Sequence, residues 1–286
     1  MKVGKSKITI IWVFSIITLI YPCFAFPQAK PTDIIVSTDN VYGQVLDHRQ
    51  HMQLLKLDIY QQLKNNKTNR PVIILVHGGG FESGDKGYTK WQGNFYPDMA
   101  TAFANQNYVV FSINYRLWPK CPIDSFSIEL DNAISDVLTA VKWIKGKYTA
   151  YGIDTTRIII CGDSAGGGLI VNASYCNSDS PLFAGCIDLW GGLAPFGIQN
   201  TKSRPVNKCP VILSTPPTCI IHGTEDEVVP YYISQELSDS LTAAGIYNEL
   251  HPLPKVGHYP VQLSDQIISI MLDFANKINK SCSKDY

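Results

Sequence analysis

A serine surrounded by small residues stands where a buried apolar run ends. Residues 157–162 read RIIICG, and the chain then completes the pattern G-x-S-x-G with Gly162, Asp163, Ser164, Ala165 and Gly166. On a turn between a strand and a helix, such a serine takes a strained backbone geometry that exposes its hydroxyl, and the glycines let the helix and the strand approach closely. The pattern predicts a nucleophile at Ser164, although G-x-S-x-G occurs by chance in a chain this long with a probability of about 0.1.

A second glycine run follows another apolar stretch, where the sequence reads PVIILVHGGG from Pro71 to Gly80. Attack of a serine on an ester carbonyl builds negative charge on the carbonyl oxygen, and backbone N–H groups freed by glycine conformations can stabilise that charge. We expect the amides of Gly79, Gly80 and Ala165 to form this oxyanion hole, with Gly78 as an alternative donor.

A serine nucleophile needs a base to take its proton and an acid to orient the base. His258, in VGHYP, follows the strand expected around residues 248–253 and is the favoured base, with His251 as the fallback. The segment HGTEDEVVP at 222–230 offers the acid, for which we favour Asp226 over Glu225. These choices give the chain order serine, acid, histidine that is expected of an α/β-hydrolase.

Apolar runs that break on glycine alternate with stretches of helical periodicity along most of the chain. Strands are expected over 54–60, 71–76, 108–116, 157–162, from 186, from 218 and near 248–253, and helices over 125–147, 232–244 and 261–280. The sheet begins by Ile34 or Leu54. Strands that alternate with helices predict a mostly parallel sheet with helices on both faces. The sequence indicates one domain over residues 26–286.

The first 25 residues have the order of a secretory signal peptide. Lys2, Lys5 and Lys7 precede an apolar run that is too short to span a bilayer, and small residues follow at Cys23 and Ala25. Removal of this segment leaves 21 basic and 24 acidic residues, a net charge of −3. Such a chain is not expected to bind nucleic acid or an anionic membrane, and it shows no metal, nucleotide or cofactor signature. We expect a secreted or periplasmic protein without a membrane span.

Taken together, HGGGF, GDSAGG, HGTEDEVVP and GH resemble the hormone-sensitive-lipase-like carboxylesterases and their bacterial ester-hydrolase relatives, over nearly all of the chain from Leu54 onward. The resemblance implies an α/β-hydrolase fold with Ser164, Asp226 and His258 as its triad. The segment NYRL at 114–117 departs from the family's DYRLAPE, because asparagine replaces aspartate.

The expected function is hydrolysis of short-chain or polar carboxylic esters, among them acetyl or feruloyl groups on polysaccharides. Because 192–217 is short and little chain precedes the sheet, we expect little or no cap domain. Phe81, Trp118 and Trp190 are candidates to line the substrate pocket. Two alternatives stay open: an amidase, formamidase or peptidase on the same fold, and a catalytically silent binding protein.

Overall fold

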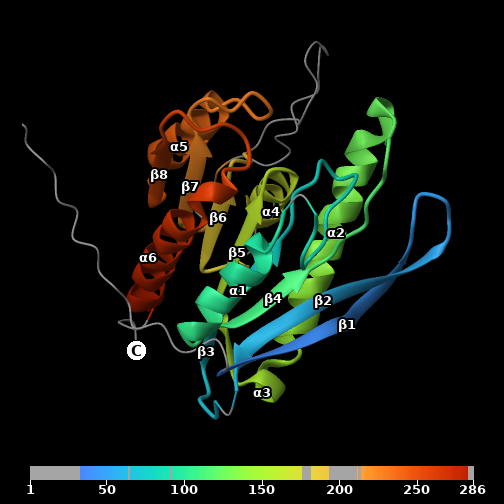
Figure 1. Ribbon diagram of the computed structural model, residues 1–286, viewed down its shortest axis with the longest axis vertical. Helices are drawn as coiled ribbons and strands as arrows, with labels where there is room; N and C mark the ends of the chain where they lie inside the picture. The colour runs from blue at the N-terminus through green and yellow to red at the C-terminus, as the bar shows by residue number, and fades with distance from the viewer. Residues whose placement is uncertain are drawn as a thin grey trace, which may run out of the picture.

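The computed structural model describes residues 33–63, 65–90, 92–175, 182–192, 211 and 214–282. Its centre is an eight-stranded sheet in the order β1-β2-β4-β3-β5-β6-β7-β8 (Figure 1). The strands are β1 Ile34–Leu46, β2 Met52–Gln62, β3 Arg70–Val76, β4 Val109–Ile113, β5 Ile153–Asp163, β6 Gly185–Leu189, β7 Thr218–Gly223 and β8 Asn248–Leu253. The six strands from β4 to β8 in this order pair in parallel, and β2 pairs antiparallel with both β1 and β4.

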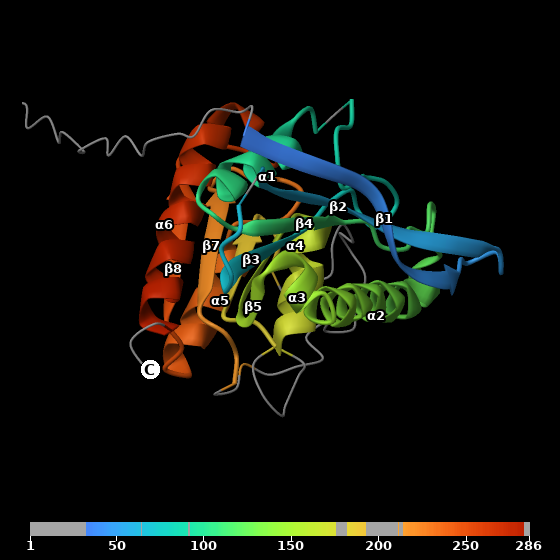
Figure 2. The ribbon, with the colours of Figure 1, turned by 90° about the horizontal axis from the view of Figure 1, so that it is seen from below.

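Helices cover both faces of the sheet, as the alternation of apolar runs predicts. They are α1 Phe95–Asn105, α2 Phe126–Lys145, α3 Tyr148–Tyr151, α4 Ala165–Tyr175, α5 Tyr232–Ala243 and α6 Ser264–Cys282. Side chains of α1 and α6 pack with Ile73 and Leu75 on one face, whereas α2, α4 and α5 pack with Val72, Ile74 and Val76 on the other (Figure 2). Since successive side chains of a strand point to opposite faces, β3 is apolar throughout because both of its faces are buried.

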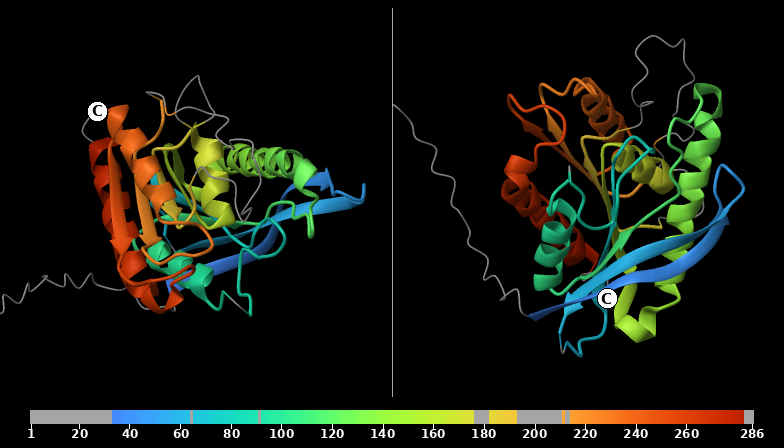
Figure 3. Two further views of the ribbon diagram at one scale, coloured as in Figure 1. Left: turned by 90° about the horizontal axis from the view of Figure 1, so that it is seen from above. Right: turned by 45° about the vertical axis from the view of Figure 1, so that its right-hand side comes forward.

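The long β1–β2 hairpin reaches beyond the rest of the sheet. Only residues 57–60 of β2 pair with β4, so the part of the hairpin nearest its turn extends past the carboxyl end of β4 (Figure 3). Tyr42 anchors this overhang, because its hydroxyl donates to the carbonyl of Asn114 at 2.5 Å.

The expected strands and the mostly parallel sheet are confirmed. Helix α2 matches the predicted 125–147 segment closely, and the predicted helix over 261–280 is a short 3₁₀ turn at Val261–Leu263 followed by α6. Helix α1 is absent from the prediction, although its buried residues recur at helical spacing. The expected signal peptide, and most of the 192–217 segment on which the expectation of no cap rests, lie outside the described residues. None of the helices described is long and apolar enough to cross a bilayer.

Candidate active site

Ser164 lies on a sharp turn between β5 and α4, at the carboxyl edge of the parallel strands. Its φ of 49° is in the left-handed region that side chains other than glycine rarely adopt. A Cβ on Gly166 would lie 2.2 Å from the carbonyl oxygen of Val76, and one on Gly162 would lie 2.5 Å from the carbonyl oxygen of Gly166. Glycine is therefore required at both positions for the strand and the helix to meet at this turn.

The structure brings the three predicted triad residues together. The Nε2 atom of His258 lies 2.9 Å from Oγ of Ser164, and its Nδ1 atom lies 2.7 Å from Oδ2 of Asp226. Ser164 follows β5, Asp226 follows β7 and His258 follows β8, so the parallel sheet supplies all three from one edge. The imidazole can therefore accept the hydroxyl proton on one nitrogen while the carboxylate fixes the other.

Four hydrogen-bond contacts hold the carboxylate of Asp226. Its Oδ1 accepts the N–H groups of Val228 at 2.8 Å and Val229 at 2.9 Å. Its Oδ2 contacts His258 Nδ1 and, at 3.1 Å, Nε2 of His222. Burial raises the pKa of Asp226, but the hydrogen bonds from His222, His258 and Val229 outweigh it and hold that pKa well below its usual range. The carboxylate is thus ionised beside the imidazole at neutral pH.

The glycine run after β3 lies beside the serine and has two free amides. Gly79 has a φ of 108° and Gly80 a φ of 64°. Within the described part of the chain, the N–H groups of Gly79, Gly80 and Ala165 donate to no other group, whereas that of Gly78 donates to Oδ1 of Asp163 at 2.7 Å. Gly78 is therefore already engaged, and the other three amides are available to an oxyanion.

Asp163, the residue before the serine, was given no role by the sequence. Its side chain is fully buried, and its Oδ1 also accepts the hydroxyl of Tyr96 from α1. Burial raises the pKa of Asp163 to about 6, although hydrogen bonds from Tyr96 and Gly78 oppose that rise. The side chain joins the serine turn, the glycine loop and α1.

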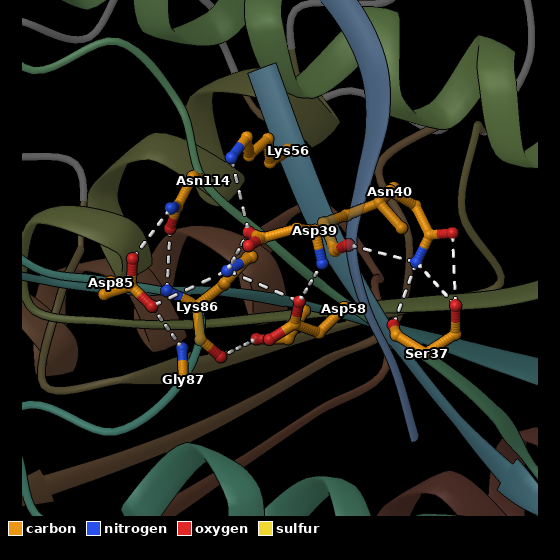
Figure 4. A network of polar contacts seen from close by, with 11 residues as sticks. Ser37, Asp39, Asn40, Lys56, Asp58, Asp85, Lys86, Gly87 and Asn114 are labelled. Atoms are coloured by element: carbon orange, nitrogen blue, oxygen red, sulfur yellow. Dashed lines mark hydrogen bonds and ion pairs between the residues drawn. The ribbon is translucent and has the colours of Figure 1, made fainter. Parts of the chain in front are cut away.

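An ionic cluster around the buried residue Lys86 holds the far end of the glycine loop (Figure 4). The ammonium lies 3.1 Å from Asp39, 3.3 Å from Asp58 and 3.9 Å from Asp85. The backbone N–H of Lys86 donates to Oδ1 of Asn114 at 2.7 Å, and Nδ2 of Asn114 donates to Asp85 at 2.9 Å. The cluster ties the loop to β1, β2 and the residue after β4.

The three aromatic candidates for the substrate pocket differ in their surroundings. Phe81 and Trp190 are 2% and 0% exposed and pack against other aromatic rings. Trp118 stacks on His48 with 5.3 Å between the ring centroids. It lines a cavity of about 290 Å³ between the overhanging hairpin and the first turns of α2, together with Glu129. Burial raises the pKa of Glu129 to about 7.

In the described part of the chain, the fallback residues His251 and Glu225 make no hydrogen bond to Ser164. His251 contacts Glu249 at 3.0 Å, and Glu225 is exposed to solvent, as expected of a surface carboxylate. His77 is fully buried against Tyr115, and burial lowers its pKa to about 4. Among the residues described, no group of three or more His, Cys, Asp or Glu side chains could hold a metal ion.

Comparison with known proteins points to the same fold. Residues 57–188 match the BD-FAE family. The chain superposes on esterase B of Lactobacillus rhamnosis with a TM-score of 0.68, at 20% sequence identity and over 89% of both chains. A truncated carbohydrate esterase from gut microbiota gives a TM-score of 0.66 at 22% identity, over 88% of this chain and 99% of that chain. The chain has the α/β-hydrolase fold.

Sequence similarity extends to part of a mammalian deacetylase. Arylacetamide deacetylase of Bos taurus is 35% identical over 148 residues, which cover 50% of this chain and 31% of the deacetylase. The chain thus spans about a third of the length of this curated relative.

Proposed function

We propose that this α/β-hydrolase is a serine carboxylesterase that works through an acyl-enzyme. The observation that carries the proposal is the continuous contact from Ser164 Oγ through His258 to Asp226, at 2.9 and 2.7 Å. The N–H groups of Gly79, Gly80 and Ala165, which donate to no other group in the described part of the chain, support it further. The names of two similar structures, both esterases, support ester hydrolysis. Arylacetamide deacetylase is named for an amide, which is why a matched amide is included in the test below.

The geometry supports a two-step reaction. His258 Nε2 takes the proton of Ser164 as Oγ attacks the ester carbonyl, and Asp226 stabilises the imidazolium that forms. The N–H groups of Gly79, Gly80 and Ala165 stabilise the developing oxyanion. His258 then gives its proton to the departing alcohol oxygen, which leaves an acyl group on Ser164. A water molecule, deprotonated by His258, hydrolyses this acyl-enzyme and restores the serine.

The proposed substrates are short-chain or polar esters, including acyl groups carried by polysaccharides. One of the similar structures is a carbohydrate esterase, and this suits the signal-peptide-like start of the chain, which indicates export.

The reaction is tested by steady-state hydrolysis of p-nitrophenyl acetate by the wild type and by Ser164→Ala. We expect kcat/KM to fall by about 10⁴-fold or more in the variant, because the nucleophile is lost. A fluorophosphonate probe should label the wild type and leave Ser164→Ala unlabelled. A variant that hydrolyses the ester as before would refute the nucleophile, and a matched amide cleaved faster than its ester would assign an amidase instead.

The substrate class is tested with a panel of p-nitrophenyl esters from C2 to C12, together with feruloyl esters and acetylated xylan. We expect kcat/KM to be highest for the short or polar acyl groups. Activity that rises steadily to C12 would contradict this part of the proposal while leaving the serine mechanism intact.

A further inference from the structure

His222, at the end of β7, lies behind the triad acid. Its side chain is fully buried. Its Nε2 atom lies 3.1 Å from Oδ2 of Asp226 and 2.8 Å from the carbonyl oxygen of Val229, and its Nδ1 atom lies 2.7 Å from Oγ of Ser234 in α5. Every polar atom of the ring thus has a partner.

These contacts fix where the proton on the ring must be. The carboxylate of Asp226 and the carbonyl of Val229 can only accept hydrogen bonds, so Nε2 must carry a hydrogen. In the neutral ring Nδ1 is then an acceptor, and the hydroxyl of Ser234 donates to it. This hydroxyl thereby selects the tautomer that presents Nε2–H to the acid.

We propose that His222 is a positioning residue that holds the carboxylate of Asp226 in line with His258. The inference rests on the proposed esterase function. Oδ2 is shared by two imidazoles, one from β7 and one from the loop after β8. With His222 in place, Oδ2 is fixed between its two ring donors, while Oδ1 is fixed by the backbone amides of Val228 and Val229. The carboxylate therefore cannot rotate away from His258 without losing a donor in a buried site.

Other charged and titratable groups surround His222. Asp188, at the end of β6, is fully buried, and burial raises its pKa to about 7. The ring of Tyr231 packs edge-on against His222 with 5.8 Å between the centroids. The other titratable neighbours in the described residues are Asp226, which contacts the ring, and His258, which contacts Asp226. Asp226 is the one of these carboxylates that hydrogen-bonds the ring, which makes it the group that His222 positions.

Three variants separate positioning from mere packing. His222→Met fills the site with an apolar side chain and removes the donor, whereas His222→Gln keeps an N–H donor. His251→Met is the matched control, since His251 lies on the neighbouring strand β8 and contacts Glu249 instead of the triad. Each variant is purified as the full chain, its cooperative thermal unfolding is recorded, and kcat and KM for p-nitrophenyl acetate are referred to the concentration of folded protein.

We expect His222→Met to lower kcat by about 10- to 100-fold with little change in KM, because a displaced acid misaligns the base. His222→Gln should recover at least part of that loss, and His251→Met should match the wild type. Equal kcat values in His222→Met and the wild type would overturn the proposal, as would an equal loss in His222→Gln and His222→Met. Lack of Ser164-dependent turnover in the wild type would instead refute the esterase itself.

A measurement on the wild type keeps the inference testable even if the His222 variants do not fold. Nitrogen-15 NMR of the protein with labelled histidine should show the Nε2–H tautomer at His222. The His222 signals are identified by their shift in Ser234→Ala. Ser234→Ala should lower kcat by a few-fold, since the other tautomer then becomes accessible. An unprotonated Nε2 in the wild type would overturn the proposal whatever the activity proves to be.

Discussion

The Oδ1 atom of Asp163 accepts the backbone N–H of Gly78 across 2.7 Å, which joins the turn that carries Ser164 to the glycine loop of the proposed oxyanion amides. The two residues are 85 positions apart in the chain and are both buried at the carboxyl edge of β3 and β5. Position 163 thus controls how the glycine loop lies relative to Ser164.

Removal of this contact should impair catalysis more than it impairs folding. In Asp163→Ala the N–H of Gly78 loses its acceptor, and the loop that carries Gly79 and Gly80 is freed to move away from the serine. We expect kcat for p-nitrophenyl acetate to fall by about 10- to 100-fold. Asp163→Asn keeps an acceptor oxygen and should stay within a few-fold of the wild type. Equal losses of kcat in both variants would show that the negative charge of Asp163 matters, and not its hydrogen bond with Gly78.

The same carboxyl should make stability depend on pH. Burial raises the pKa of Asp163 to about 6 in the folded state, above its usual value of 3.8. The folded protein therefore binds a proton that the unfolded chain releases between these values, and the contribution of this group to the free energy of unfolding decreases as the pH rises from about 4 through about 6. Urea unfolding should show that Asp163→Asn gains stability relative to the wild type between pH 4.5 and pH 7. A constant difference across this range would contradict the expectation.

The strands could be predicted from the sequence because apolar runs mark them locally, and motifs and chain order indicated the three residues of the proposed triad. The apolar run before Ser164 and the glycines around it specify a turn, and the chain order then selects Asp226 and His258. Asp163, His222 and Lys86 carry no such mark. Their roles depend on partners from distant strands, and a buried carboxylate or imidazole cannot be distinguished from a surface residue until those partners are known. Helix α1 was recognisable, because its apolar residues recur at helical spacing.

Loss of the Lys86 ammonium should destabilise the fold. The Lys86 and Asp58 side chains are 9% and 6% exposed, so replacement of Lys86 by methionine leaves a buried carboxylate without its counter-ion. We expect a loss of about 3 kcal/mol in the free energy of unfolding. Lys56→Met is the control, because the Lys56 side chain is 40% exposed and, among the described residues, its one ion pair is with the exposed carboxylate of Asp39. Similar urea midpoints for the two variants would refute this account of the cluster.

Asn114 stands where the resembling esterases have aspartate, and the structure gives a physical reason. Its Nδ2 donates to Oδ2 of Asp85 at 2.9 Å, whereas an aspartate would place a second carboxylate there. Asn114→Asp should therefore lower the melting temperature, and more so at pH 8 than at pH 4, where carboxyls begin to protonate. The double variant with Asp85→Asn should recover the loss. A melting temperature unchanged at both pH values would show that Lys86 compensates the added charge.

The two glycines of the oxyanion loop provide a matched pair of substitutions. A Cβ on Gly79 would lie 2.1 Å from the carbonyl oxygen of Ser83, while a Cβ on Gly80 meets nothing within 4 Å. Both have positive φ, at 108° and 64°, but the value at Gly80 is close to the left-handed region that alanine can enter at a cost of about 1 kcal/mol. Gly79→Ala must displace the loop, so kcat should fall by about 100-fold or more. Gly80→Ala should fold and retain most of the wild-type kcat for p-nitrophenyl acetate. If Gly80→Ala lowered kcat more than Gly79→Ala did, the assignment of the oxyanion donors would have to change.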